Sequence, residues 1–255
     1  MCKHIWSLAK INLRHLQVPY VLTGITTGAM AIQTLVLLIL HWNGVNVANQ
    51  SNISFGNILW LIPLMAGIFI PARNFRRIIN LGGKRSNFFW GSLMVYAVLA
   101  AAVSLTNIAI FYVIDLPIIN AEIFMPMYPF YPAGTFILGE PGHIGGVANL
   151  VEVFRWSHNG IVVAFFQQFA FLFLIGTFAH SFTAIQDKWY GWLTGVAFIA
   201  IISVFTPIAP LRAALVWFFN LIIFHDAAVL QIVACIVLGM VIYSINKPVL
   251  ARKAI

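Results

Sequence analysis

Long apolar runs alternate with short polar segments along the whole chain. A helix needs about 20 mostly apolar residues to cross the hydrocarbon core of a membrane, and six stretches have roughly this length. The pattern therefore predicts six transmembrane helices, at residues 18–41, 53–72, 88–114, 160–180, 191–209 and 227–246.

The first 17 residues carry a different pattern, with polar side chains on one face of a helix and apolar side chains on the other. The polar face holds Lys3, Ser7, Lys10 and Arg14, and the apolar face holds Ile5, Ala9, Leu13 and Leu16. This spacing is typical of a helix that lies in the membrane interface. A frayed basic leader is the alternative.

A basic segment at residues 73–85 follows the second predicted span. Five of the 14 Lys and Arg residues fall there. Arg73, Arg76, Arg77 and Asn80 recur at helical spacing opposite Phe75, Ile78 and Ile79. Proline favours the first turn of a helix and glycine favours the end, so we expect a short amphipathic helix that starts near Pro71 and stops at Gly82 and Gly83. Ser86 is the predicted N-cap of the third span.

The letters "GGKRS" within this segment invite comparison with a nucleotide-binding loop. The phosphate-binding pattern G-x-x-x-x-G-K-[ST] requires a first glycine where Ile78 stands and a Ser or Thr where Arg85 stands. The pattern fails at both positions. Any ATP chemistry must therefore come from another polypeptide.

Two other segments separate the predicted spans. Residues 115–159 contain five prolines, which oppose a continuous helix, and aromatic side chains that suit a membrane boundary. They predict an ordered outer segment, acting either as a gate or exit surface or only as an aromatic belt. Residues 210–226 have an apolar part too short to cross a membrane comfortably, and predict a re-entrant helical hairpin. The gate candidates are Tyr128, Phe130, Tyr131 and Arg212.

Charge and composition fix the class and the orientation. The chain is 62% hydrophobic and 8% charged, so the fold class is an all-α integral membrane protein, with residues 1–255 forming a single transmembrane domain. Twelve of the 14 Lys and Arg residues fall on one side of the predicted spans. By the positive-inside rule, both termini are cytoplasmic. With so few charges the chain offers no broad basic surface, which excludes nucleic acid as a partner.

Uncharged polar residues are the candidates for lining a pathway within the spans. They are Thr26, Gln33, Asn107, Gln167 and Gln168. The alternative is that they join helices through hydrogen bonds. The predicted spans hold almost no ionisable residues, which argues against ion-driven transport.

An enzymatic function is a further alternative. His143, His158, Glu140 and Glu152 all fall on the outer side, but their spacing matches no metalloenzyme motif. His180 is interpreted as an interfacial residue at the inner end of the fourth span. The sequence predicts no catalytic residue, metal or cofactor in this chain.

The order of these elements resembles the permease subunit of ABC-2 type bacterial exporters, including small exporters of amphipathic cytolytic peptides. The stretch "ARNFRRIINLGGKRSNFFWGSLMVY" is similar to the coupling segment of that family, and "QDKWYGWLTGV" is similar to the entry into its fifth span. The outer segment 115–159 is longer than in many relatives.

The resemblance implies a multi-pass protein of the bacterial cell membrane that works with a second permease chain, identical or different, and two ATP-binding cassette subunits. ATP and Mg²⁺ would be bound by those subunits. The resemblance further implies that Arg73, Phe75, Arg76, Arg77, Ile78, Ile79, Asn80, Gly82 and Gly83 form the docking helix. The cargo expected is an amphipathic or hydrophobic peptide, delivered in contact with membrane lipid. A permease-like immunity or scaffold protein without transport is the alternative.

Overall fold

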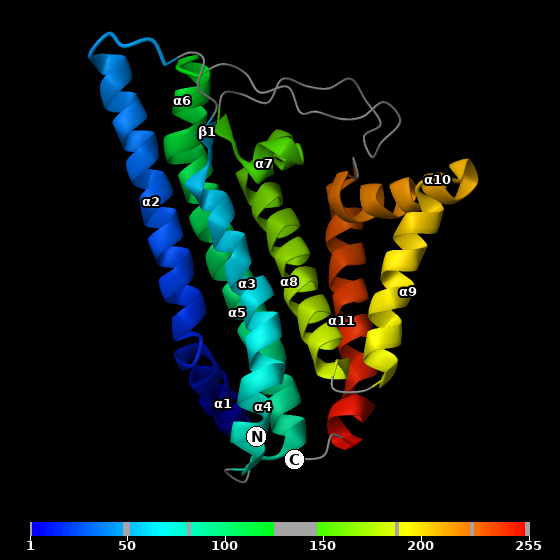
Figure 1. Cartoon of the computed structure of the whole chain (residues 1–255). Coiled ribbons are helices and arrows are strands. Elements are labelled where there is room, and N and C mark those ends of the chain that lie inside the picture. Colours follow the sequence, from blue (N-terminus) through cyan, green and yellow to red (C-terminus); the bar gives the residue numbers. More distant parts are fainter. Residues whose placement is uncertain are drawn as a thin grey trace.

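The computed structural model describes residues 2–47, 52–80, 83–124, 147–186, 189–224 and 227–252 of the chain. These residues are almost all helical, and Figure 1 shows the long helices running side by side. The α-helices are α1 (Cys2–Arg14), α2 (Gln17–Trp42), α3 (Leu61–Phe69), α4 (Phe75–Asn80), α5 (Arg85–Ile110), α6 (Leu116–Asn120), α7 (Leu150–Val153), α8 (Ile161–Ile185), α9 (Trp189–Phe205), α10 (Ala209–Phe219) and α11 (Ala228–Arg252).

The remaining elements are short. Two 3₁₀-helical turns are η1 (Phe55–Trp60) and η4 (Trp156–Asn159), and three π-helical turns are η2 (Ile70–Asn74), η3 (Phe111–Asp115) and η5 (Asn220–Phe224). Strands β1 (Asn52–Ile53) and β2 (Val147–Ala148) pair in parallel. This strand pair joins the start of the second span to the segment before α8.

Five helical runs among the described residues are long and apolar enough to cross a membrane. They are Gln17–Trp42, Phe55–Asn80, Arg85–Asn120, Ile161–Ile185 and Ala228–Pro248. They confirm five of the predicted spans in position. The prediction of six spans is met only if the bent pair of α9 and α10 counts as one.

The fifth predicted span, at residues 191–209, is shorter in the structure. Helix α9 ends at Phe205, and the axis of the following helix is turned by 116°. Pro210 lies in the first turn of α10. Because proline cannot continue a preceding helix without losing a hydrogen bond, Pro207 and Pro210 account for the break.

The segment predicted as a re-entrant hairpin has no hairpin turn in its described residues, and its re-entrant character stays a prediction. Residues 209–224 form one helix, α10, whose last turn is η5, and Figure 1 shows α10 lying across one end of the long helices. The apolar stretch after Pro210 contains no glycine or proline to end the helix, so the chain continues in one direction. Residues 225 and 226 lie outside the described part.

Prolines inside the second and third spans do not end the helices there. Pro71 lies within η2, and Pro117 is the second residue of α6, which directly follows η3. In a π-helical turn each N–H reaches the carbonyl five residues back, as Phe75 N–H does with Ile70 O. A proline is accommodated because the hydrogen bonds it disrupts are replaced by this wider pattern. The third span therefore runs on to Asn120, beyond its predicted end at residue 114.

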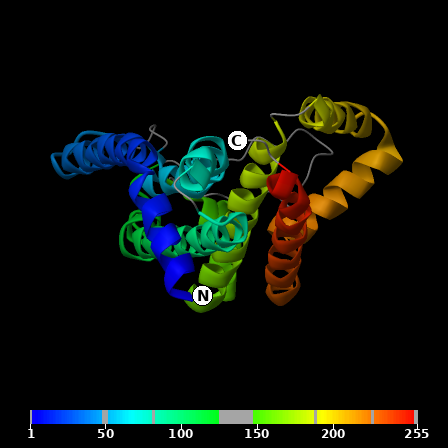
Figure 2. The same ribbon diagram turned by 90° about the horizontal axis from the view of Figure 1, so that it is seen from below.

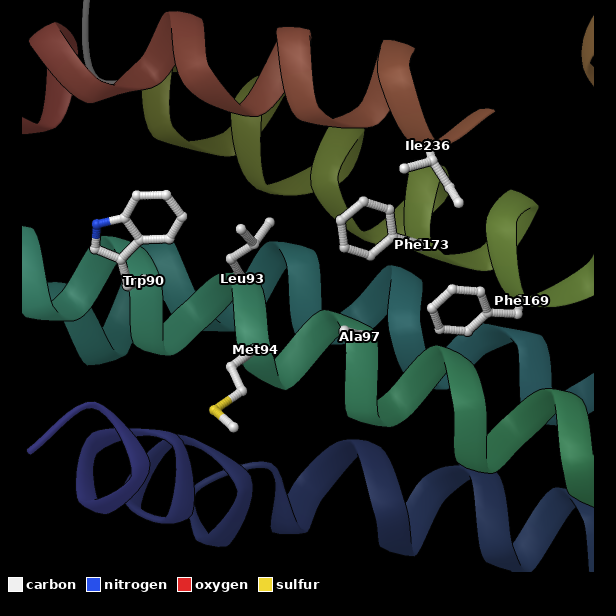
Figure 3. A pocket seen from close by; sticks show the side chains of 7 residues that line it. All are labelled: Trp90, Leu93, Met94, Ala97, Phe169, Phe173 and Ile236. Carbon is white, nitrogen blue, oxygen red and sulfur yellow. The ribbon is translucent and has the colours of Figure 1, made fainter. Parts of the chain in front are cut away.

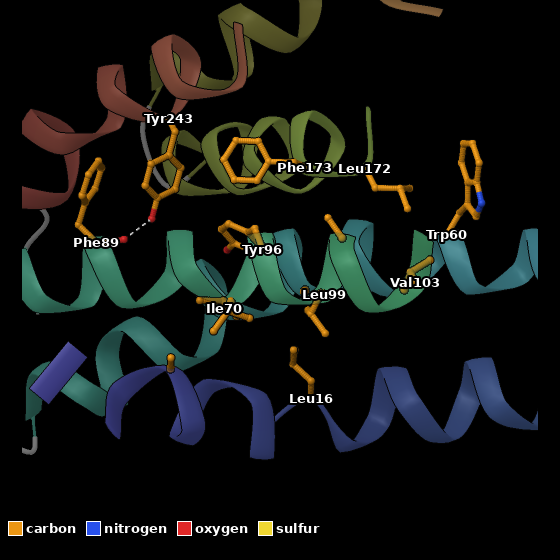
Figure 4. Close-up of a cluster of buried hydrophobic side chains, with 14 of the residues drawn as sticks. Leu16, Trp60, Ile70, Phe89, Tyr96, Leu99, Val103, Leu172, Phe173 and Tyr243 are labelled. Atoms are coloured by element: carbon orange, nitrogen blue, oxygen red, sulfur yellow. Dashed lines mark hydrogen bonds between the residues drawn. The ribbon is translucent and has the colours of Figure 1, made fainter. Parts of the chain in front are cut away.

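Helix α8 is the centre of the bundle. It packs against α3, α5 and α11 and buries residues on all sides. At the contact with α3, a Cβ on Gly67 would lie 2.6 Å from Gly176 O and 2.6 Å from Ala179 Cβ. The two backbones therefore approach closely only because residue 67 has no side chain. Figure 4 shows the apolar core that surrounds this helix, from Leu16 to Trp60 and Tyr243.

Helices α2 and α9 lie at the edges of the bundle. Helix α2 buries only Pro19, Thr23 and Thr34 among its 26 residues, and most of α9 is exposed within this chain. Figure 2 shows α9 standing apart from the helices around α8 and α10 running from α9 back toward α11, while α1 crosses below α5. Exposed apolar faces of this kind are expected to contact lipid or another chain.

Candidate functional site

The basic segment forms part of one end of the bundle, together with α1 and the end of α11 (Figure 1). We call this the basic end. Arg73, Arg76 and Arg77 are exposed there, as is Asn80. Phe75 and Ile78 are buried and Ile79 is half-buried. The two faces predicted for this segment are confirmed.

The boundaries of this helix differ from the prediction. Pro71 does not start a separate helix, because α3, η2 and α4 run on without a break and Arg73 lies in η2. Gly83 N–H donates to Ile78 O at 2.9 Å and closes α4, as expected for a helix stop, while Gly82 lies outside the described residues. Helix α5 begins at Arg85 after Lys84, so Ser86 is not its N-cap.

Helix α4 is held firmly by its neighbours. Asn74 Nδ2 donates to Asn12 Oδ1 of α1 at 3.1 Å, and both side chains are buried. The Phe75 ring meets Phe88 of α5 edge to face, with centroids 5.2 Å apart. The exposed arginines are therefore carried on a helix that continues directly from a transmembrane run and is fixed to α1 and α5.

His15, between α1 and α2, lies beside this basic surface. Arg77 Nη1 is 3.5 Å from His15 Nδ1. Since arginine has no acceptor, the contact requires an unprotonated Nδ1. Partial burial, followed by the charges of Arg77, Arg14 and Arg73, lowers the pKa of His15 from its ordinary value of 6.5. The neutral form of His15 is favoured in the folded chain.

We expect this histidine to make the fold less stable in mild acid. As the pH falls through about 6.5, the unfolded chain takes up the proton first, so the free energy of unfolding decreases until the lower folded-state pKa is passed. The measurement is the thermal unfolding midpoint in detergent between pH 7.5 and 5 for wild type and His15→Gln. The difference between the two curves isolates His15 from the other histidines. A wild type that gains stability on acidification, relative to His15→Gln, would contradict the assignment.

The five candidate pathway residues separate into two groups. Gln33 is exposed and Thr26 is half-buried on α2, where the Thr26 hydroxyl donates to Leu22 O at 2.9 Å. Asn107, Gln167 and Gln168 are fully buried between helices. The latter three therefore join helices within this chain, the alternative that the sequence left open.

Asn107 and Gln168 belong to a buried polar cluster near the end opposite the basic end. The amide of Asn107 is oriented so that its oxygen accepts from Trp60 Nε1 at 3.1 Å and Gln168 Nε2 at 2.9 Å, and its nitrogen donates to Gly56 O at 3.3 Å. This orientation satisfies both ends of the amide.

Asp115 is the acidic member of this cluster. Its Oδ2 accepts from Ser54 Oγ at 2.7 Å and from Asn149 Nδ2 at 2.7 Å, and the side chain is buried. Sequence reasoning missed it, since the predicted third span ended one residue earlier. The signal available was an acid placed between apolar residues, "FYVIDLPII". A carboxylate inside a helical span marks a site worth testing.

Gln167 belongs to a second buried chain of hydrogen bonds. Asn159 Nδ2 donates to Gln167 Oε1 at 3.1 Å, Gln167 Nε2 donates to Gln231 Oε1 at 2.6 Å, and Gln231 Nε2 donates to Ile222 O at 3.1 Å. The last acceptor is a carbonyl of η5. The side chains of α8 and α11 thus bind the irregular last turn of the α10 segment.

His180 is not interfacial, contrary to the prediction. It is fully buried on α8, and its Nδ1 lies 2.6 Å from the Tyr96 hydroxyl. Tyr243 of α11 packs on it, with ring centroids 4.9 Å apart, and donates to Phe89 O at 2.8 Å (Figure 4). The helix extends past His180 to Ile185, which places this histidine a full turn deeper than its sequence position suggested.

An apolar groove lies between α5, α8 and α11. Its volume is about 440 Å³, and nearly all of its exposed lining is carbon. Figure 3 shows the side chains that line it, which are Trp90, Leu93, Met94, Ala97, Phe169, Phe173 and Ile236. It was not predicted, because grooves depend on how helices diverge and not on any local motif.

The outer gate candidates are mostly beyond what the structure describes. Tyr128, Phe130 and Tyr131 lie outside the described residues, as do Glu140 and His143 of the enzymatic alternative. Arg212 is half-buried in the first turn of α10. The gate role of these residues stays a prediction.

The fold and the hydropathy indicate a predominantly helical, multi-pass membrane protein. Comparisons with protein families, curated proteins and solved structures find no match for this chain. The likeness to exporter permeases therefore stays a prediction from the two quoted stretches and the order of elements.

Proposed function

We propose that the chain is the permease subunit of an ATP-driven exporter in a bacterial cell membrane. It forms the translocation pathway with a second permease chain, while a separate ATP-binding cassette subunit binds ATP and Mg²⁺. The cargo we propose is an amphipathic or hydrophobic peptide. Both chain ends and the basic end face the cytoplasm in this proposal, as the distribution of Lys and Arg favours.

One observation carries the proposal. The exposed basic face of α4 is continuous with a membrane-crossing helix and is fixed to α1 and α5 by Asn74–Asn12 and Phe75–Phe88. A basic surface needed only for topology would require no such attachment. A surface that is moved by an ATPase does require this attachment, because the movement of a loose loop would not be passed on to the membrane-spanning helices.

The test is charge reversal on that face, with Arg76→Glu and Arg77→Glu combined. We expect association with the partner ATPase to weaken at least about tenfold, equivalent to ~1.4 kcal/mol, and transport and stimulated ATP hydrolysis to fall with it. The measurement is co-purification and ATPase activity with the neighbouring gene product. Arg76→Glu alone leaves the Arg77–His15 contact in place and should show part of the loss.

The matched control is the pair Lys10→Glu and Arg14→Glu on α1. Both residues are exposed at the same end, so the control removes the same charge without touching α4. The docking role is contradicted if both double variants weaken association equally. Absence of any ATP-hydrolysing partner would favour the scaffold alternative, in which the chain acts without transport.

A further inference from the structure

The groove described above has a closed and an open end. Helices α5 and α11 both pack on α8 and meet each other where the Tyr243 hydroxyl donates to Phe89 O, with their rings 4.4 Å apart. From this contact toward the opposite end of the bundle the groove opens, floored by Phe169 and Phe173 of α8 and walled by Ala97 and Ile236. The contact of Tyr243 with Phe89 thus closes the groove toward the basic end.

The mouth of the groove faces away from the bundle. Trp90 and Met94 are 41% and 40% exposed, whereas Phe173 on the floor is buried. All three helices cross the membrane over the part that lines the groove, so the medium at the mouth is lipid hydrocarbon. Apolar lining at that depth admits a hydrocarbon chain and offers a polar ligand no hydrogen bond.

The apolar lining alone does not favour one lipid over another. A lipid tail that moves from the bilayer into an apolar groove loses no contact with water, so the hydrophobic effect contributes little. Any preference for one kind of lipid must therefore come from contacts between the protein and the lipid headgroup. Basic residues between helices at a membrane surface attract anionic headgroups by about 1 kcal/mol each.

Two exposed lysines stand at the closed end of the groove. Lys247 lies one helical turn beyond Tyr243 on α11, and Lys84 comes immediately before α5, five residues ahead of Phe89. The acidic side chains that the structure describes, Asp115, Glu122 and Glu152, belong to segments at the other end of the bundle. The electrostatic potential at the basic end is therefore positive, because none of the carboxylates in the described part of the chain lies close enough to reduce it.

We propose that this groove binds one acyl chain of an anionic membrane phospholipid whose phosphate lies at Lys84 and Lys247. The volume falls in the range of small-molecule sites, about 300–1,000 Å³. The site is independent of export and holds whether or not the chain is a permease.

The test uses the full chain in phosphatidylcholine vesicles with increasing mole fractions of brominated phosphatidylglycerol or brominated phosphatidylcholine. Bromine quenches nearby tryptophan, and the Trp90 signal is the difference between wild type and Trp90→Phe. We expect saturable quenching, with half-saturation by the brominated phosphatidylglycerol at a mole fraction at least about fivefold lower than by brominated phosphatidylcholine.

Two variants separate the tail from the headgroup. Ala97→Phe fills the groove and should remove the saturable component, and Ala97→Leu serves if the larger residue prevents folding. Lys247→Gln should keep the quenching and reduce the preference for phosphatidylglycerol by about fivefold. The matched controls are Val98→Phe, which is exposed on α5 outside the groove, and Lys10→Gln on α1. Both should behave as wild type.

Two results would overturn the proposal. Quenching that rises in proportion to mole fraction, equally for both lipids and equally in Ala97→Phe, would show only general lipid contact. Absence of Trp90 quenching by either lipid would show that the groove is filled by something else, such as a second copy of the chain.

Discussion

Gly67→Ala should lower the free energy of unfolding by about 1–3 kcal/mol, the range for overpacking a well-packed contact. The new methyl group would lie 2.6 Å from Gly176 O and 3.0 Å from His180 N of α8. These are backbone atoms, which cannot rotate away as the end of a side chain can. Helices α3 and α8 would have to separate, and thermal unfolding in detergent measures the loss.

Gly28→Ala is the matched control for this prediction. A Cβ at Gly28 on α2 meets nothing within 4 Å, so the change leaves packing intact and slightly favours the helix. The control should unfold at the wild-type temperature or above it. Equal losses in the two variants would show that the contact between α3 and α8 is looser than described.

Asn149→Leu should also lower the free energy of unfolding, by about 2–4 kcal/mol. Asn149 donates to Asp115 Oδ2 at 2.7 Å and to Ser54 Oγ at 3.1 Å, and its Oδ1 accepts from Val151 N at 2.9 Å as the N-cap of α7. Leucine has nearly the same size but leaves a buried carboxyl group short of a donor. The readout is again thermal unfolding in detergent.

Asn149→Ser divides this loss into two parts. Serine can still cap α7 but does not reach Asp115, so the loss that remains reports the contact with the carboxyl group. Asn43→Leu is the surface control: Asn43 is exposed and its side chain donates only to Ile39 O at the end of α2, so we expect the free energy of unfolding to fall by no more than about 1 kcal/mol. Wild-type stability in Asn149→Ser would show that Asp115 does not depend on this asparagine.

The positions of the long helices were predictable because membrane-spanning runs are set by local composition. Their ends were less predictable. Pro71 and Pro117 were interpreted as boundaries, and π-helical turns instead carry the helices past them. That error in the third span is also why Asp115 was placed outside it and its burial was missed.

The burial of a site residue could be predicted from the sequence only where its helix has one polar and one apolar face. The segment with Arg76 and Ile78 alternates polar and apolar residues, so its exposed and buried sides followed from spacing alone. Helix α8 is apolar all round, and no periodicity distinguishes Gln167 and Gln168, which are buried, from a residue that faces lipid. Their partners on α11 and α5 come from tertiary packing, which spacing does not encode.

The π-helical turn η2 also determines which side of α4 faces outward. It contains one residue more than an α-helical turn would, and each residue of an α-helix advances the direction of its side chain by about 100°. Without the extra residue, each residue of α4 would take the place of the one before it, so Arg76 would take the buried place of Phe75 and Ile78 the exposed place of Arg77. When this chain is aligned with one whose second span is a regular α-helix, a one-residue gap belongs within Ile70–Asn74, or every position of α4 is paired with the wrong face.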